Sequence, residues 1–407
     1  MSQLAAHRQA GTGRDSQSRR RTQSFAALRR IAALGALGAL TSVGLASCGS
    51  PALPTSTDSL GAPLVAAVAG STGTWVSLPA GQLGSPATTY WQLVHGAGSS
   101  WRLETPPGVA TNGGLVTSLG PHGQLVVGIE PSQRLLFSPL VSRATPTGPW
   151  TTGAVPAGLA AVPDALATSS NGRLLAIVTT NGGEVLSSPG GLSGWSSVGS
   201  LASINSQSAP AGCMLRALSA VAFEGVTPIV GGSCRSPSLT APIDALINGR
   251  WRDIGPRGNW GTRDVDVLRL TATRDGVAAL IEWRGIAKHV WLVSAHESRG
   301  SSTWRPGFAV DVYTIVFTLS AADGSSVIVS RDPHGLCGIM TFDQHGVPGI
   351  YTSTPPGACV VSGSPSAGYE ALGMHGSTLD VYAETRAPVT WRLVQRLTVP
   401  ITLGSSR

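Results

Sequence analysis

A turn glycine recurs about every fifty residues along this chain, and this repeat constrains the fold more than any other feature. Each glycine lies between two short β-type runs, with successive spacings of 50, 49, 53, 51, 48 and 44 residues. Asn171-Gly172, Asp275-Gly276 and Asp323-Gly324 place an Asx-Gly pair where a hairpin needs a positive φ. The seven turn glycines are Gly73, Gly123, Gly172, Gly225, Gly276, Gly324 and Gly368.

An aromatic residue in the fourth run of each repeat keeps step with the glycine. The distances from glycine to aromatic are 28, 27, 23, 26, 28, 27 and 23 residues. A period near fifty with four short strands per copy is typical of a β-propeller blade. The sequence therefore predicts an all-β fold, a seven-bladed β-propeller of four-stranded antiparallel blades over residues 60–403, with the aromatics packed between blades. The aromatics are Trp101, Trp150, Trp195, Trp251, Trp304, Tyr351 and Trp391.

The first part of the chain lies outside the repeat. Residues 1–30 are polar and arginine-rich, and an apolar run from Ile31 follows that is shorter than the ~20 residues needed to span a bilayer. The run ends in Leu45-Ala46-Ser47-Cys48, which resembles the lipobox of bacterial lipoproteins. The resemblance implies that residues 1–47 are a signal peptide and that Cys48 becomes the acylated first residue of the mature protein. The alternatives are an ordinary transmembrane anchor or a cleavable signal with an incidental cysteine.

The charge balance belongs to this targeting segment. The chain has a formal net charge of +7, but residues 1–47 hold seven arginines and one acid, which leaves 21 basic and 20 acidic residues in the rest. A nearly neutral mature protein gives no electrostatic reason to expect a nucleic-acid partner. Residues 48–59 read as the lipidated cysteine and a flexible Pro/Ser/Thr linker, so we expect a protein anchored by lipid to the extracytoplasmic face of the cell membrane. Ser18-Arg19-Arg20-Arg21 leaves open whether export uses the general or the twin-arginine route.

The remaining four cysteines are expected to form two disulfides, because their number is even and the chain is exported. A tight turn at Ala222–Gly225 places Cys213 opposite Cys234, within disulfide reach. By elimination Cys337 pairs with Cys359 and ties the sixth unit to the seventh. A metal site is the alternative, but the sequence has no Cys-x-x-Cys spacing, so we predict no metal.

No residue pattern indicates a catalytic site or a cofactor. His289 and His296 would point to opposite faces of one strand, which does not suit a pair of metal ligands. Asp264 and Asp266 share a face, as paired carboxylates must, but a surface salt bridge with nearby arginines is the favoured interpretation. We therefore predict neither catalytic residues nor a cofactor.

Two propeller families resemble parts of the repeat. The run Ala167-Thr168-Ser169-Ser170-Asn171-Gly172-Arg173-Leu174-Leu175-Ala176 is similar to WD-repeat and related bacterial propellers, whose Trp-Asp dipeptide is absent here. The fourth-strand tryptophan resembles sialidase-type repeats, but no copy matches their Ser-x-Asp-x-Gly-x-x-Trp box. Sialidases hold the substrate carboxylate with a first-blade arginine, and this sequence has no arginine between Cys48 and Trp101. The resemblance implies an architecture and carries over no catalytic residue.

The expected function is that of a non-enzymatic binding or assembly scaffold at the cell envelope, with a protein or an envelope glycan as partner. The alternative is a carbohydrate-active, sialidase-like glycoside hydrolase whose carboxylates converge from distant units. The second-to-third-strand loops and the loops between units share one face, which we predict to bind. Trp260 lies outside the strand register and is either a binding anchor or partly buried against a neighbouring loop. The candidates on this face are Arg257, Trp260, Arg263, Arg284, Lys288 and His334.

Overall fold

The fold is known from a computed structural model that describes most of the repeat region. The chain divides into two units, Met1–Cys48 and Gly49–Arg407, and all described residues lie in the second. This described part contains 28 strands and one short helix, and it includes no helix long and apolar enough to cross a membrane. The described residues are 67–70, 73–83, 88–104, 115–120, 123–129, 140–145, 147–153, 163–178, 183–208, 214–235, 240–258, 260, 264–284, 290–298, 303–312, 314–321, 323–365, 368–386 and 389–399.

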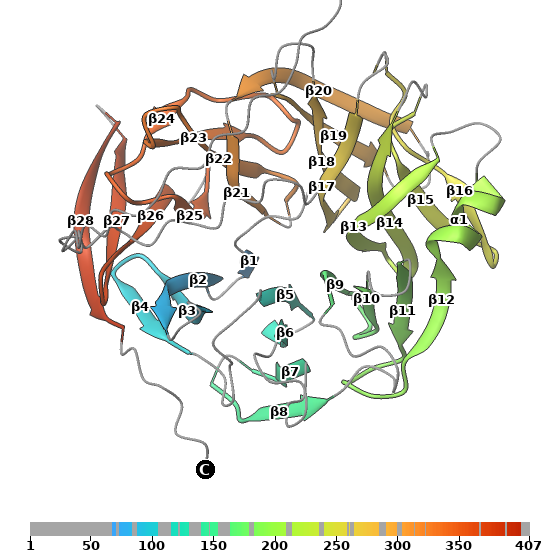
Figure 1. Ribbon diagram of the computed structural model, residues 1–407, viewed down its shortest axis with the longest axis horizontal. Helices are drawn as coiled ribbons and strands as arrows, with labels where there is room; N and C mark the ends of the chain where they lie inside the picture. Colours follow the sequence, from blue (N-terminus) through green and yellow to red (C-terminus); the bar gives the residue numbers. More distant parts are fainter. Residues whose placement is uncertain are drawn as a thin grey trace, which may run out of the picture. The chain divides into compact units, whose positions relative to one another are not determined.

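Five sheets contain four antiparallel strands each, joined in sequence order (Figure 1). The first holds β1 (Ala67–Gly70), β2 (Gly73–Leu83), β3 (Thr88–Ala97) and β4 (Ser100–Leu103). The second holds β5 (Leu115–Leu119), β6 (Leu125–Ile129), β7 (Leu140–Arg143) and β8 (Trp150–Gly153). The third holds β9 (Ala165–Thr168), β10 (Leu174–Val178), β11 (Glu184–Ser188) and β12 (Ser196–Ser200).

The last two four-stranded sheets lie at the C-terminal end of the chain. One holds β21 (Thr314–Ser320), β22 (Ser326–Arg331), β23 (Cys337–Phe342) and β24 (Thr352–Ser353). The other holds β25 (Val360–Ser364), β26 (Gly368–His375), β27 (Thr378–Arg386) and β28 (Val389–Thr398).

The sheet between these two groups has eight strands. It begins with β13 (Leu215–Glu224), β14 (Thr227–Arg235), β15 (Ile243–Ile247) and β16 (Arg250–Asp253). It continues with β17 (Asp264–Thr273), β18 (Gly276–Arg284), β19 (Val290–Ser298) and β20 (Thr303–Val312). The two groups are joined because the end of β14 pairs with the start of β17, with Ser233 opposite Asp266, Cys234 opposite Val265 and Arg235 opposite Asp264.

The prediction of seven separate blades is therefore wrong. Counted as hydrogen-bonded sheets, the described strands form a six-bladed all-β propeller whose blades are mostly four-stranded. The fifty-residue period counts groups of four strands, and it carries no information on whether two successive groups also pair with each other. Here β14 is nine residues long, so its last three residues reach the next group and fuse two expected blades into one sheet.

The turn chemistry that predicted the hairpins is present. Gly172 has a φ of 84° and Gly276 a φ of 148°, values that residues with a Cβ rarely adopt. Gly172 follows Asn171 in the turn between β9 and β10, and Gly276 opens β18 directly after the Asp275 turn. The interior strand β10, Leu174–Val178, is apolar throughout, and all five of its residues are buried. Strands covered on both faces need no polar alternation.

Several fourth-strand tryptophans pack against the preceding group of strands, as predicted. Trp251 on β16 is 1% exposed, and its indole Nε1 donates to the Val198 carbonyl of β12 at 3.2 Å. The Trp391 indole donates to the Ser353 carbonyl of β24 at 2.8 Å, and the Trp304 indole donates to the Ile254 carbonyl. One aromatic of the repeat thus closes each of these junctions with both an apolar contact and a hydrogen bond.

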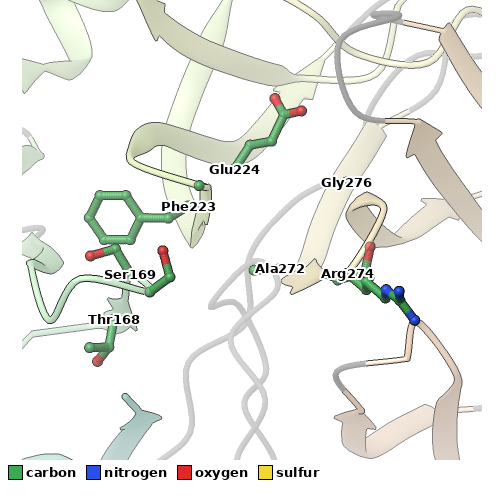
Figure 2. A pocket seen from close by; sticks show the side chains of 10 residues that line it. Thr168, Ser169, Phe223, Glu224, Ala272, Arg274 and Gly276 are labelled. Atoms are coloured by element: carbon green, nitrogen blue, oxygen red, sulfur yellow. The ribbon is translucent and has the colours of Figure 1, made fainter. Parts of the chain in front are cut away.

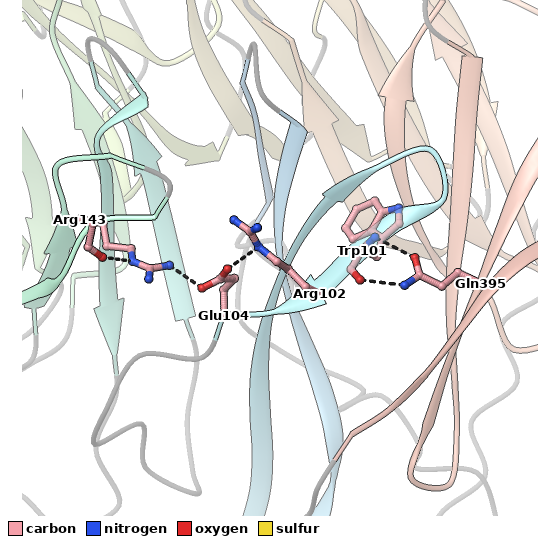
Figure 3. Close-up of polar contacts among 6 residues, drawn as sticks. Trp101, Arg102, Glu104, Arg143 and Gln395 are labelled. Carbon is pink, nitrogen blue, oxygen red and sulfur yellow. Dashed lines mark hydrogen bonds and ion pairs between the residues drawn. The ribbon is translucent and has the colours of Figure 1, made fainter.

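The last sheet is tied to the first by side chains (Figure 3). The Trp101 backbone N–H on β4 donates to Gln395 Oε1 on β28 at 2.7 Å, and Gln395 Nε2 donates to the Trp101 carbonyl at 2.9 Å. The Trp101 indole also donates to Glu370 Oε2 on β26 at 3.2 Å. The carboxamide of Gln395 therefore takes the place of a backbone partner and joins residues 294 positions apart.

The helix α1 (Leu201–Ser208) was not expected, because eight residues are too few to show helical periodicity. Its start is set by a reciprocal cap, in which the Ser203 backbone N–H donates to Ser200 Oγ at 3.1 Å and the Ser200 backbone N–H donates to Ser203 Oγ at 2.8 Å. Buried Ile204 docks the helix, and Gln207 Oε1 accepts from the Trp251 backbone N–H at 2.8 Å.

The structure contains the expected disulfide between Cys337 and Cys359, with a Cα–Cα distance of 5.4 Å, and it links β23 to the residue before β25. Cys234 is disulfide-bonded as well. Its expected partner, Cys213, lies outside the described residues, so that pairing stays a prediction. The register argument for it was wrong: the turn residues are Gly225 and Val226, and Cys234 lies opposite Leu215 because β13 is bulged.

Candidate functional site

A pocket of about 160 Å³ lies where three first-to-second-strand turns converge. The turns are those between β9 and β10, between β13 and β14, and between β17 and β18. They converge because the first strands of successive groups run beside one another, so that the ends of these strands meet on one face of the propeller. The described lining residues are Thr168, Ser169, Ser170, Phe223, Glu224, Gly225, Ala272, Thr273, Arg274 and Gly276.

The pocket wall combines hydroxyl groups, two opposite charges and an aromatic ring (Figure 2). Ser170 and Arg274 are exposed, Glu224 is partly exposed, and Phe223 is buried beneath them. Figure 2 shows Glu224 and Arg274 projecting from different turns, with Ser169 and Phe223 on the side away from Arg274. Glu224 and Arg274 form no ion pair with each other among the described contacts, so both charges remain available to a ligand.

The wall on the Ser169 side is held by hydrogen bonds within its turn and by a ring contact to the next turn. Ser169 Oγ donates to Asn171 Oδ1 at 2.6 Å, and the Arg173 backbone N–H donates to Ser169 Oγ at 2.9 Å. The Arg173 guanidinium lies 5.9 Å from the centre of the Phe223 ring, which ties the first turn to the second. A preorganised wall reduces the entropy lost when a ligand binds.

The binding face predicted from the sequence lies at the opposite end of the strands from the pocket. In an antiparallel sheet the first-to-second and second-to-third turns lie at opposite ends, so the pocket opens on the face that the sequence argument did not choose. The turns that line it had been recognised through Gly172, Gly225 and Gly276, but only as hairpin turns. The missed signal was the set of hydroxyl and charged residues directly before these glycines.

The structure does not bring the described binding residues predicted from the sequence together at one site. Arg257 is exposed, and His334 is exposed in the turn between β22 and β23. Trp260 is only 6% exposed and packs edge-on against Trp283 with ring centroids 6.3 Å apart. Trp260 thus belongs to the apolar interior of the eight-stranded sheet.

Other candidates fall on residues that cannot be described. Cys48, Arg263, Lys288 and Cys213 lie outside the described residues. Lipidation of Cys48 and binding by Arg263 and Lys288 therefore stay predictions.

Arg284, the remaining candidate, belongs to an acidic cluster on the eight-stranded sheet. Its Nε lies 2.8 Å from Glu282 Oε1 and 3.9 Å from Asp266 Oδ2. Asp266 is 0% exposed and neither of its carboxylate oxygens has a hydrogen-bond partner. Burial, followed by the nearby charge of Glu282, raises the pKa of Asp266 to about 7. Asp266 does form an ion pair with an arginine, Arg284, but its carboxyl group is buried, so the expected surface position is wrong.

The placement of carboxylates and possible metal ligands limits the chemistry of the described residues. Glu224 is the single carboxylate among the described residues of the pocket wall, and the buried pair of Asp266 and Glu282 lies elsewhere on the sheet. Within the described ranges, no group of three or more His, Cys, Asp or Glu is placed to hold a metal ion. The pocket offers hydrogen bonds and charge to a ligand.

No known protein family matches this chain, and no curated protein matches it. Similar solved structures include AofleA from Arthrobotrys oligospora, with 15% identity, a TM-score of 0.43, and coverage of 71% of this chain and 85% of that chain. YCF48 bound to the D1 peptide has 13% identity, a TM-score of 0.42, and coverage of 78% and 97%. The lectin of Aleuria aurantia, a six-bladed β-propeller with a fucose recognition mode, has 11% identity, a TM-score of 0.37, and coverage of 84% and 97%. At these identities the likeness concerns the fold, and the chain is similar to such propellers in architecture.

Proposed function

We propose that this protein is a non-enzymatic binding scaffold that engages a larger partner through the pocket at the β9–β10, β13–β14 and β17–β18 turns. The observation that supports it is the convergence of three turns carrying hydroxyl groups, Glu224 and Arg274 around one cavity. A cavity of about 160 Å³ is smaller than the roughly 300 Å³ at which small-molecule sites begin. It therefore suits one group of a longer molecule, such as a sugar unit of an envelope glycan or a polar side chain of a protein.

The proposal includes the cellular location of the protein. The lipobox-like Leu45-Ala46-Ser47-Cys48 would place a lipid on Cys48 and hold the propeller at the extracytoplasmic face of the membrane. Partners are then components of the cell envelope. The glycoside hydrolase alternative needs two carboxylates about 5–10 Å apart on one site, and no described feature of the pocket favours it.

Cross-linking in intact cells tests the proposal with the full chain. A photoreactive residue at exposed Ser170 would capture whatever occupies the pocket. We expect one recurrent protein or polysaccharide, lost when Glu224→Gln and Arg274→Gln are combined. We also expect Cys48→Ser to release the protein from the membrane fraction and to abolish metabolic labelling with palmitate.

The matched control removes the same two charges elsewhere. Arg305→Gln combined with Asp311→Asn takes one positive and one negative charge from exposed positions on β20, so the net charge changes as in the pocket variant. An unchanged cross-linking pattern in the pocket variant would contradict the binding proposal. Hydrolysis of envelope glycan that disappears with Glu224→Gln alone would show that the site is catalytic.

A further inference from the structure

Polar side chains join the first strands of neighbouring groups, which lie nearest the centre in Figure 1. Ser118 on β5 and Thr168 on β9 share a hydrogen bond of 2.8 Å between their hydroxyl groups. Ser219 on β13 donates to the Val267 carbonyl on β17 at 2.8 Å. Both contacts are neutral and part-buried.

The junction between β17 and β21 differs because it uses a guanidinium. Arg269 on β17 donates from Nε to Thr318 Oγ1 at 3.1 Å and from Nη2 to the Thr318 carbonyl at 3.0 Å. A permanent positive charge thus occupies the kind of junction that a neutral hydroxyl fills elsewhere. Thr318 is 1% exposed, so the anchor of this guanidinium is fixed within the protein.

The charge of Arg269 has no counter-charge among the described residues. Both of its polar contacts are to Thr318, and it takes part in no described ion pair. Burial alone lowers the pKa of Arg269 to about 10, with no charged neighbour acting on it. Its folded pKa still lies above neutral pH, so the group stays ionised. A cation removed from bulk water is normally paired, because leaving it unpaired costs free energy.

The orientation of the guanidinium leaves donors for a ligand. An arginine has five N–H donors, and the edge formed by Nε and Nη2 is used by Thr318. The adjacent end of the guanidinium, formed by Nη1 and the second N–H of Nη2, matches the two oxygens of a carboxylate or phosphate. Arg269 is partly exposed as a whole residue, while its charged group is desolvated by burial.

We propose that Arg269, held by Thr318, is an anion-binding site at the junction of β17 and β21 that takes a carboxylate or phosphate group. The site is separate from the pocket. Arg274, the charged pocket residue closest to Arg269 along the chain, lies in the turn after β17. A failure of the pocket variant in cross-linking would leave this proposal untouched, and the reverse also holds.

Titration calorimetry on the full chain in detergent tests the site with inorganic phosphate and with acetate as probes. We expect one binding site for at least one of the two anions, abolished in Arg269→Gln. Arg269→Lys keeps the charge but loses the planar fork, so its affinity should fall about 10-fold or more. Exposed Arg252→Gln on β16 is the control and should bind as the wild type does. Preference for one probe identifies the chemistry of the ligand; binding of neither, or equal binding by Arg269→Gln, overturns the proposal.

Thermal unfolding separates an anion site from a merely structural arginine. Arg269→Met keeps the length of the side chain and removes the unpaired charge, so without added anion its Tm should rise by about 1–3 °C. The same variant should lose the rise in Tm that phosphate or acetate gives the wild type. A fall in Tm for Arg269→Met, together with an unchanged response of this variant to the anions, would show that Arg269 only supports the fold.

Discussion

At the scale of single residues, Asp266 shows that a strand pattern does not reveal whether an ionisable side chain is exposed or buried. The alternation of β17 correctly places Asp264 and Asp266 on one face, but it does not say whether that face meets solvent. Because β14 pairs with the start of β17 and β18 pairs on its other side, Asp266 lies in the interior of the eight-stranded sheet and not at its edge. Ser233, directly opposite Asp266, is also buried, and its hydroxyl has no hydrogen-bond partner.

The raised pKa of Asp266 predicts that the protein loses stability as pH rises from about 4 to about 7. The folded pKa is about 7 and the ordinary value 3.8, so between these values the folded state holds a proton that the unfolded state has released. The free energy of unfolding should therefore fall as pH rises from about 4 through 7, by on the order of 2–4 kcal/mol for this group. Burial also raises the pKa of Asp244 to about 7, so this carboxyl group adds to the same trend.

Asp266→Asn is the variant that isolates the contribution of this residue. Asparagine has nearly the same shape and does not titrate, so the fall in stability between pH 5 and pH 8 should shrink in urea unfolding. Asp275→Asn, on the exposed turn after β17, is the control and should keep the wild-type dependence. Equal pH dependence in Asp266→Asn and the wild type would mean that Asp266 titrates normally.

At the scale of elements, the fourth-strand tryptophans Trp251, Trp304 and Trp391 join neighbouring groups of strands through hydrogen bonds. Trp251 lies flat against Gly199 of β12, where a Cβ would collide with its indole, and it donates to the neighbouring Val198 carbonyl. Trp195, in contrast, donates to Leu192 within its own loop at 3.2 Å. The aromatic residue recurs at a similar position in each copy of the repeat, while the hydrogen-bond partner of that residue differs from one copy to the next.

Trp251→Phe should therefore cost more stability than Trp195→Phe. The first change removes an indole that is 1% exposed and its hydrogen bond to the part-buried Val198 carbonyl, so we expect a loss of about 2–4 kcal/mol in the free energy of unfolding. The second removes a half-buried ring, and about 1 kcal/mol or less should be lost. Urea unfolding of both variants measures the difference, and equal losses would contradict a joint at Trp251.

Strand groups were predictable from the sequence because turns and apolar runs are local signals. Leu174–Val178 and the turn at Gly172 are encoded within a dozen residues. The pairing of β14 with β17 is not local: it depends on how far β14 runs past its hairpin, and Ser233 and Asp266 carry no mark of it in the sequence. The pocket was missed for a related reason, since Thr168, Glu224 and Arg274 meet only once three groups are arranged around the centre.

At the scale of the whole molecule, the ring is closed by side chains instead of by strand pairing. Among the described residues, the sheet of β25–β28 and the sheet of β1–β4 are separate hydrogen-bonded sheets. Gln395 makes both of its hydrogen bonds to the backbone of Trp101 across this junction. A second contact in this region links the first sheet to the second, where Glu104 pairs with Arg143 at 2.5 Å (Figure 3).

Gln395→Ala should loosen this junction in both directions around the ring. Losing the carboxamide leaves the Trp101 N–H and carbonyl without their partner, so we expect the free energy of unfolding to fall by about 1–3 kcal/mol. Hydrogen exchange measured by mass spectrometry should show faster exchange in β4 and in β28 together, although these strands lie at opposite ends of the repeat region. Gln207→Ala is the control, because Gln207 Oε1 also accepts from the backbone N–H of a fourth-strand tryptophan, Trp251. That variant should speed exchange around α1 and β16 and leave β4 and β28 unchanged. Faster exchange in β28 alone after Gln395→Ala would mean that the first sheet does not depend on the last, and that the ring is held closed by its apolar contacts.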